Sequence, residues 1–592
     1  MRPAPAHAAT PSEPPTHAAD GAPSDAVTAP GVPAGRSADS APSGTLPAPG
    51  ERGGRFQLAG GLAANGPGRG TGSWAGPVAL TGLLVALAAV VTVLQKSPCL
   101  LHGWGAPDVY YAGCYSDWAA LYGGRGFAAD PWAPFRAGST FEYPVLMSVV
   151  GSVAAWITQA LPFSPEQGTV VFWLVNFGFV VVLWAVVAVL TVRMAGRRWT
   201  DGLMVAVAPG IVLAGTINWD LWAVALLACG MYAWSRGRSL TAGVLFGLGA
   251  AMKLYPLLIL GPLLILAVRS RRWRPFLLAA GGTVAAWAAV NVPLMVVNFQ
   301  AWSVFFTFSG ERGPGLSSVW HAWDVTAAQA GWAFVPEDSL TLLAYGTFAV
   351  CCLGIFVLGV RVRHTPRLAQ LTFLVVAAFV LTNKVYSPQF VVWLIPLLAL
   401  ALPRWRDFWV WQTVEALHFF AVWMYLAKGV AETPPQHSMD DSVYVAAILA
   451  HMLAVLWLCG RVVWEMLHPA EDLVKRDHGG HPDTDPLAGA YAADSGPARG
   501  RSGRRPRFRR SPSGGSGSPG TTAARSSPSR RRRPRGAAAD RRTAPRRRPW
   551  PPSSARATSR GGRWPGPRPR RGAPDARRRR RGRGCGPRPR PG

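Results

Sequence analysis

Two carboxylates, Asp117 and Glu142, lie on one polar segment of an otherwise strongly apolar chain. The segment reads CYSDWAALYGGRGFAADPWAPFRAGSTFEYPVL and follows the first run that is apolar enough to span a membrane. A carboxylate can act as a general base, because it can take the proton from a hydroxyl group that attacks an electrophilic carbon. Carboxylates among aromatic residues beside a hydrophobic bundle suit the transfer of a sugar at a membrane surface. We therefore predict that Asp117 is catalytic and that Glu142 contacts the substrate.

Both carboxylates also have a structural interpretation. Ser116 and Asp117 precede an apolar and aromatic stretch, so Asp117 is equally placed to cap a helix at the membrane surface. Glu142 is next to the Tyr143-Pro144 pair, where the proline restricts the backbone. A structural role for Glu142 therefore fits the sequence as well as a substrate contact does.

Further polar residues recur where apolar runs begin or break. The triplet Asn218-Trp219-Asp220 begins one run, and Asp220 could serve only the N-terminal dipole of a helix. Lys253 falls within GLGAAMKLYPLLIL, where an unpaired ammonium is costly and a lipid phosphate would balance its charge. We predict that Asn218, Asp220 and Lys253 contact the substrate. Five further predicted substrate contacts lie in two later loops: Arg312, His321, Lys384, Tyr386 and Gln389. For His321 and Lys384, an ordinary place in a solvated loop is the competing interpretation.

Membrane helices are predicted to position these residues. The composition indicates such helices when the two polar ends of the chain are considered separately from its middle part. Residues 501–592 hold 31 Arg and 2 Asp, which is +29 of the formal net charge of +31. Residues 1–70 and 469–592 are predicted to be disordered, because they contain few large apolar residues. The basic end is consistent with a tail that contacts anionic lipid or with an out-of-frame end of a GC-rich gene. No specific nucleic acid is expected, because aromatic residues do not alternate with its arginines.

Residues 71–468 are predicted to form an all-α, polytopic membrane domain of about 12 membrane helices. Apolar runs are found at 76–94, 168–192, 199–217, 219–235, 240–268, 275–292, 339–360, 367–381, 388–402, 408–426 and 443–463. Arginines cluster in the loops near residues 193–198, 236–238, 269–274, 361–367 and 404–406. The positive-inside rule places these loops and both termini in the cytoplasm.

This topology requires two irregular segments. Residues 141–161 must lie as a juxtamembrane or re-entrant helix on the outer side, because a full crossing would place Arg193 outside. Residues 240–268 must cross twice, although they are too short for two full spans of about 30 Å. We therefore predict two short helices that meet inside the protein at Lys253, near the outer face. The predicted site then faces outward from the cell membrane.

Cysteines and sequence motifs limit the possible chemistry. Cys99 and Cys114 fall in the predicted first outer loop, an oxidising location, and are predicted to form a disulfide. The remaining cysteines show no metal-ligand spacing, and we predict no metal site. The sequence contains no P-loop, dinucleotide fingerprint or zinc motif, which argues against cytosolic nucleotide chemistry.

The order of these features resembles a known family. A first span, a long acidic loop, FEYP, NWD, GLGAAMKLYP and TNKVYSPQF follow one another between about residues 76 and 465. This order is similar to that of the polyprenol-phosphate-sugar-dependent membrane glycosyltransferases of the GT-C superfamily, and most of all to the actinobacterial mannosyltransferase-like glycosyltransferase family 87. The resemblance implies a multi-helix fold in which the first outer loop supplies the catalytic aspartate, here Asp117. It also implies a lipid-phosphate donor, often of mannose or a pentose, and inversion at the anomeric carbon.

A mechanism follows in which Asp117 is the general base and Lys253, with Arg312 or Lys384, stabilises the leaving phosphate. The partners are then a polyprenol-phosphate sugar, a glycolipid or glycan acceptor and membrane lipids. No cofactor is expected, although some relatives carry adjacent acidic residues where this chain has Asp117 alone, so dependence on a divalent metal stays open. Two alternatives remain: a lipid or sugar transporter or flippase with a site around Lys253, and a scaffold that binds partners through its basic tail.

Overall fold

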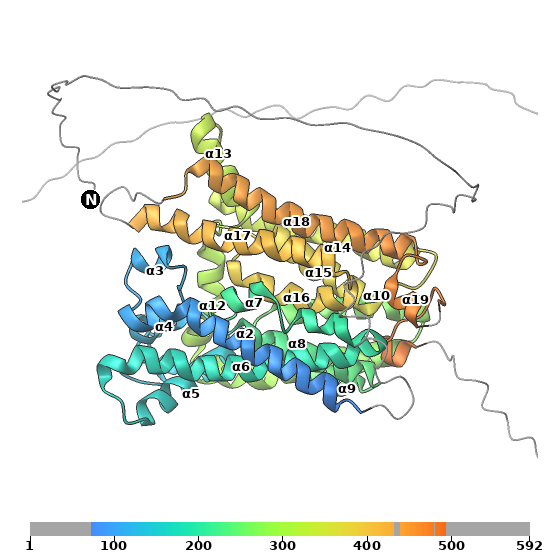
Figure 1. Cartoon of the computed structure of the whole chain (residues 1–592), viewed down its shortest axis with the longest axis horizontal. Helices are drawn as coiled ribbons and strands as arrows, with labels where there is room; N and C mark the ends of the chain where they lie inside the picture. Colours follow the sequence, from blue (N-terminus) through green and yellow to red (C-terminus); the bar gives the residue numbers. More distant parts are fainter. Residues whose placement is uncertain (1–72, 431–437, 479, 493–592) are drawn as a thin grey trace, which may run out of the picture. The chain divides into compact units, whose positions relative to one another are not determined.

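The computed structural model describes residues 73–430, 438–478 and 480–492. Every secondary structure element within these ranges is a helix, and none of the described residues forms a strand (Figure 1). The predicted all-α membrane fold is therefore confirmed. The predicted N-terminal tail, 1–70, and residues 493–592 of the predicted C-terminal tail lie outside the described residues.

Five helical segments of the described chain are long and apolar enough to cross a membrane. They are α2 (Ala75–His102), α6 (Gly168–Ala195) with its flanking turns, α11 (Trp273–Val297), α14 (Glu337–Arg361) and α18 (Asp441–Leu467). Shorter apolar helices complete the bundle: α5 (Val145–Ala160), α8 (Asp220–Ser235), α9 (Ser239–Met252), α10 (Leu260–Ser270), α15 (Leu368–Thr382) and α16 (Val391–Ala401). The long helix α17 (Trp405–Val430) packs along α18.

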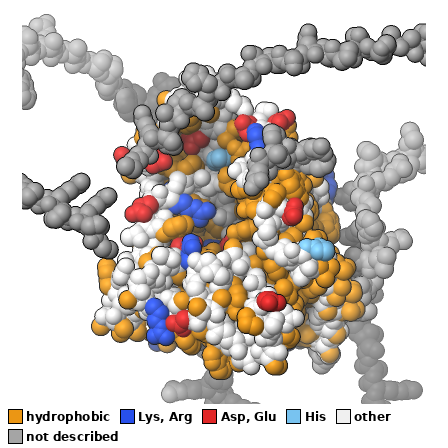
Figure 2. Space-filling model, turned by 90° about the vertical axis from the view of Figure 1, so that its left-hand side faces the viewer, with side chains coloured by type: hydrophobic (Ala, Val, Ile, Leu, Met, Phe, Trp, Pro, Cys, Tyr) orange, Lys and Arg blue, Asp and Glu red, His pale blue; other side chains and the backbone are white. Residues whose placement is uncertain are grey.

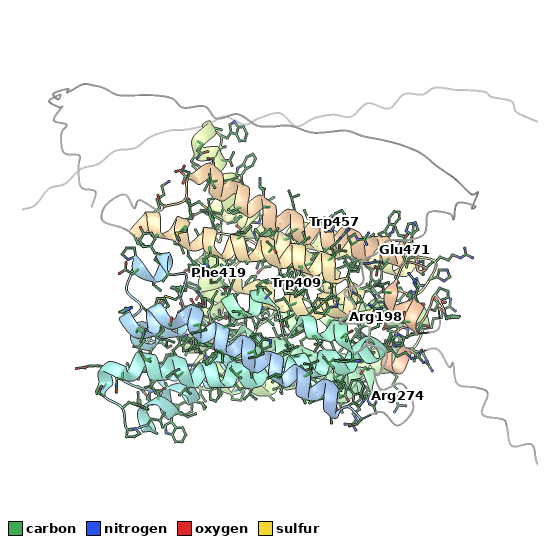
Figure 3. The ribbon with its side chains drawn as sticks, in the orientation of Figure 1. Arg198, Arg274, Trp409, Phe419, Trp457 and Glu471 are labelled. Carbon is green, nitrogen blue, oxygen red and sulfur yellow. A yellow bond between two sulfur atoms is a disulfide. The ribbon has the colours of Figure 1, made fainter. Side chains whose placement is uncertain are left out.

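The helices run largely along one direction, so the bundle has two ends (Figure 1). The arginine end carries the loops that were predicted to be cytoplasmic, and Arg198, Arg274 and Glu471 lie there (Figure 3). The opposite end, the cavity end, carries α3 (Asp108–Tyr111), α4 (Asp117–Gly124), α12 (Phe299–Glu311) and α13 (Val319–Ala330). The arginine clusters and the predicted site residues are thus separated by the length of the bundle.

Both predicted irregular segments are present. Helix α5 stays at the cavity end, because Val145 at its start lies beside Leu254, and Gln159 near its end donates to the carbonyl of Phe127 at 2.9 Å. Helix α9 ends at Lys253, whose extended backbone (φ −159°) breaks the helix. The chain then returns through the 3-10 helix η4 (Tyr255–Ile259) and α10.

The predicted continuous span at 199–217 is wrong. This stretch crosses the bundle as two short pieces, the 3-10 helix η3 (Gly196–Met204) and α7 (Pro209–Ala214). Gly202 packs so closely on α6 that a Cβ atom there would lie 2.5 Å from the Cα of Val192. Irregular backbone is tolerated at this depth because the neighbouring helices bury it.

The folded region also extends beyond the predicted boundary at residue 468. Residues after α18 form α19 (Leu473–Asp477) and the 3-10 helix η6 (Gly489–Tyr491) at the arginine end. Asp472 pairs with Arg367 at 2.7 Å, and both side chains are buried. The composition of this segment is that of a polar tail, but its carboxylates neutralise arginines of the bundle. It therefore belongs to the fold.

Candidate active site

A cavity of about 710 Å³ opens at the cavity end of the bundle. Figure 2 views this end and shows a hollow with Lys and Arg side chains inside it. Eight of the ten predicted site residues line the cavity: Asp117, Glu142, Asn218, Lys253, Arg312, Lys384, Tyr386 and Gln389. The other two, Asp220 and His321, are not among the lining residues. Residues from five separate stretches of the chain therefore meet around one space.

Asp117 begins α4, and its carboxylate is oriented by groups from other segments. The Tyr143 hydroxyl donates to Oδ2 at 3.0 Å, and the Asn218 amide donates to the same oxygen at 3.3 Å. Burial raises the pKa of Asp117 above its ordinary value, although hydrogen bonds from Tyr115, Tyr143 and Asn218 act in the opposite direction. The carboxylate is therefore a stronger proton acceptor than an exposed aspartate.

The contacts of Asp117 are not those of a helix cap. Ser116 is the N-cap residue of α4, but its hydroxyl donates to the carbonyl of Thr216 at 2.7 Å and accepts no bond from the helix. The Asp117 carboxylate accepts from side chains across the cavity and not from the first backbone amides of α4. The capping interpretation therefore finds no support in the hydrogen bonds of the described residues.

Glu142 lines the cavity with its carboxylate already paired. Arg125 binds it through two parallel bonds, Nε to Oε2 at 2.8 Å and Nη2 to Oε1 at 2.9 Å. A bidentate pair of this kind occupies both carboxylate oxygens and fixes their position. Glu142 is thus suited to holding the loop. Arg125 was not among the predicted site residues, because nothing in the local sequence GGR indicates that it pairs with Glu142.

Lys253 is not the unpaired cation that the sequence suggested. Its Nζ lies 2.7 Å from Oδ1 of Asp220, and that carboxylate also accepts from the Trp393 indole at 2.6 Å. The ammonium lies over the rings of Phe390 and Trp393, at 5.3 and 5.5 Å from their centroids. Asp220 is only 3% exposed and lies behind Lys253, which explains why it does not line the cavity. Lys253 therefore needs no lipid phosphate to balance its charge.

Arg312 and Lys384 are the cavity cations without a carboxylate partner among the described residues. Lys384 donates from Nζ to the carbonyl of Gly310 at 2.8 Å and to the hydroxyl of Thr341 at 2.9 Å. Burial lowers the pKa of Lys384, and the nearby positive charge of Arg312 lowers it further. Two cations that line the same cavity attract anions to it.

Comparison with known proteins finds one family that the chain resembles. Residues 141–382 match the family model of glycosyltransferase family 87. This match covers less than half of the chain and supports its assignment to that family. The matched region includes Glu142, Asn218 and Lys253 but neither Asp117 nor Lys384. Comparison with curated proteins gives no match.

The match to family 87 supports a membrane glycosyltransferase. The transporter and scaffold interpretations gain no support from it. The fold and the family therefore agree with the class of enzyme predicted from the sequence. The donor, the acceptor and the catalytic residue are not contained in the family match.

Aromatic side chains form another part of the wall of this glycosyltransferase cavity. Tyr110, Tyr115 and Trp423 pack on one another with ring centroids 4.7 to 5.9 Å apart. Flat rings of this kind can pack against the apolar face of a sugar. These three residues were not predicted to belong to the site, although Tyr115 lies only two positions before Asp117.

His321 lies on α13 away from the cavity lining, contrary to the predicted substrate contact. Its ring packs edge-on against Tyr425 and Tyr444, with centroids 5.8 and 6.2 Å away. Burial lowers the pKa of His321, so the ring is mostly neutral near pH 7. Its Nε2 is buried and has no hydrogen-bond partner among the described residues.

A disulfide joins Cys99 and Cys114, whose Cα atoms are 5.9 Å apart. Cys99 lies in the last turn of α2 and not in the loop that follows it. The bridge therefore ties the end of α2 to the segment that leads into Asp117.

Proposed function

We propose that this glycosyltransferase transfers mannose from a polyprenol phosphate to a hydroxyl group of an extracytoplasmic lipid or glycan, with Asp117 as general base. The observation that supports the reaction is that a carboxylate without a cationic partner and two cations without a carboxylate partner line the same cavity, among the described residues. Asp117 accepts hydrogen bonds from Tyr143 and Asn218, whereas Arg312 and Lys384 form no ion pair with a described carboxylate. Mannose is supported by the resemblance to the family and not by the geometry.

In the proposed step, the acceptor oxygen forms a bond to the anomeric carbon and gives its proton to Asp117. The bond between that carbon and the phosphate oxygen breaks, and the phosphate leaves with the electron pair. Arg312 and Lys384 stabilise the negative charge on the phosphate through charge-assisted hydrogen bonds. A single displacement inverts the configuration of the sugar. No cofactor takes part in this step.

The remaining surface of the cavity suits a lipid tail. Phe305, Phe306, Tyr345 and Phe379 line it together with the polar residues. The opposite end of the bundle carries the arginine clusters, which the positive-inside rule places in the cytoplasm. This distribution supports a plasma-membrane enzyme whose cavity faces the extracytoplasmic side.

The proposed function is tested with membranes that contain the full chain, a radiolabelled polyprenol-phosphate mannose and endogenous acceptors. Wild type should move label into a glycolipid or glycan. Asp117→Asn should reduce the rate by at least about 10²-fold, the effect typical of removing a general base. Asp108→Asn, an exposed carboxylate of the same loop, is the matched control and should transfer normally.

Two results would contradict the proposal. Near-normal transfer by Asp117→Asn would remove this residue as the base. Failure of wild type with every polyprenol-phosphate sugar tested, mannose included, would remove the lipid-phosphate donor.

A further inference from the structure

A second cluster of ionisable side chains lies buried between two helices beside the cavity. Glu415 and His418 belong to α17 and His451 belongs to α18, and one possible ligand atom from each lies within 4.8 Å of the others. Their exposed fractions are 6%, 1% and 0%. None of the three is among the predicted site residues, and the proposed sugar transfer does not use them.

The hydrogen bonds of His451 determine which of its nitrogens carries a proton. Nε2 lies 3.1 Å from the carbonyl oxygen of Ser317, which can only accept, so Nε2 is the donor. In a neutral ring, Nδ1 then has a free lone pair, and it lies 3.7 Å from Oε2 of Glu415. Two acceptors that face each other in a buried space repel each other unless a cation lies between them.

His418 adds a third unsatisfied group to this space. Its Nε2 is buried and has no hydrogen-bond partner among the described residues, and its ring stacks on that of His451 with centroids 3.8 Å apart. A buried polar atom without a partner is costly. In the described part of the chain, neither Nδ1 of His451 nor Nε2 of His418 has a hydrogen-bond partner.

The spacing and the surrounding contacts are those of a metal site in a helical bundle. Glu415 and His418 are three residues apart on one helix, an arrangement that combines with ligands from other helices in metal-binding bundles. The Trp411 indole donates to Oε1 of Glu415 at 2.9 Å, and the carbonyl of Ser317 accepts from His451. Contacts of this kind orient metal ligands and set the tautomer of a histidine.

We propose that Glu415, His418 and His451 bind one divalent transition-metal ion of the Zn²⁺ type and so join α17 to α18. Two imidazoles and one carboxylate form a ligand set that Zn²⁺ accepts, with one position left open. Bonds of about 2.0 to 2.2 Å require ligand atoms roughly 3.3 Å apart, so the three side chains must close inward slightly when the metal binds.

The site supports the wall of the sugar cavity. The ring of Tyr386, which lines that cavity, lies on His451 with centroids 4.6 Å apart. A metal at His451 therefore fixes Tyr386 and the two helices around it, while Asp117 and the cations carry the transfer. This role is structural and goes beyond the proposed function. The alternative occupant is a proton, which would make His451 an imidazolium paired with Glu415.

Metal binding by the purified full chain distinguishes the two occupants. After treatment with a chelator and dialysis in detergent, added Zn²⁺ should bind at about one ion per chain and raise the temperature of unfolding. His418→Gln and His451→Gln should lose both effects. His468→Gln, which changes an exposed histidine at the C-terminal end of the helix that carries His451, should keep both.

Replacement of Zn²⁺ by Co²⁺ gives a second measurement that needs no variant. Visible absorption of Co²⁺ in the wild-type chain, removed by an equivalent of Zn²⁺, is expected for a site with imidazole and carboxylate ligands. The proposal is overturned if folded wild type binds no more Zn²⁺ than folded His451→Gln. If the variants do not fold, absence of the Co²⁺ absorption in wild type overturns it by itself, and a shared proton then accounts for the cluster.

Discussion

At the scale of single residues, the site depends on how Asp117 is held. The Tyr143 hydroxyl donates to Asp117 at 3.0 Å and stabilises the charged form of the carboxylate. Tyr143→Phe removes this bond, so the pKa of Asp117, already raised by burial, should rise further. If Asp117 is the base, kcat/KM falls as the pH drops through that pKa. The acid limb of the profile should therefore move to higher pH.

The profile is measured with vesicles at fixed donor concentration. Tyr111→Phe in the same loop serves as control, and its acid limb should coincide with that of wild type. An unchanged limb in Tyr143→Phe would show that a group other than Asp117 controls the rate at low pH.

Arg312 and Lys384 should contribute to donor binding, because they face the cavity without a carboxylate partner among the described residues. A hydrogen bond to a charged group contributes about 1.5 to 3 kcal/mol, so Arg312→Met or Lys384→Met should weaken donor affinity by roughly 10- to 100-fold. The measurement is KM for the lipid-phosphate sugar, compared with KM for the acceptor. A rise confined to the acceptor would place the phosphate elsewhere.

At the scale of structural elements, the junction between α9 and η4 is held by an ion pair. Lys253 lies 2.7 Å from Asp220, and the two side chains are 18% and 3% exposed. Lys253→Met leaves a buried carboxylate without its cation, which typically costs about 3 to 5 kcal/mol. The single variant should thus unfold more easily in detergent, in addition to any effect on donor binding.

The second variant needed is Lys253→Met combined with Asp220→Asn. The amide keeps an acceptor for the Trp393 indole without a buried charge, so the double variant should recover most of the lost stability. Thermal unfolding of the three proteins measures this coupling. Equal losses in the single and double variants would show that the ion pair does not hold the junction.

At the scale of the whole molecule, the folded region ends later than its composition suggests. Truncation after Ala492 removes only residues outside the described part of the chain, and we expect the product to fold and transfer sugar. Truncation after Pro469 removes Asp472 and leaves Arg367 buried without its partner. Loss of one partner of a buried pair costs about 3 to 5 kcal/mol, so this product should express poorly.

Asp472→Asn in the full chain is the matched control, because it removes the charge and keeps the segment. It should be destabilised as well. Loss of transfer on truncation after Ala492, with normal folding, would instead assign a functional role to the basic residues beyond that point.

Several features were predictable because they depend on local sequence. Hydropathy and arginine clusters predicted the all-α membrane fold, and the apolar run around Lys253 predicted two short helices, since its length cannot hold two full spans. Most of the polar residues predicted at the ends of apolar runs line the cavity, because the ends of membrane helices meet at the same face. The motif order predicted the family.

Other features were decided only by the tertiary structure, because they depend on which helix faces pack together. The partners of Lys253, Glu142 and Arg367 are separated from them in the sequence, and no local pattern identifies Asp220, Arg125 or Asp472 as those partners. The same reason applies to the cluster of Glu415, His418 and His451, whose spacing becomes meaningful only when α17 lies against α18. Local composition determines where a chain crosses a membrane, whereas the choice of charge partners follows from packing between distant segments.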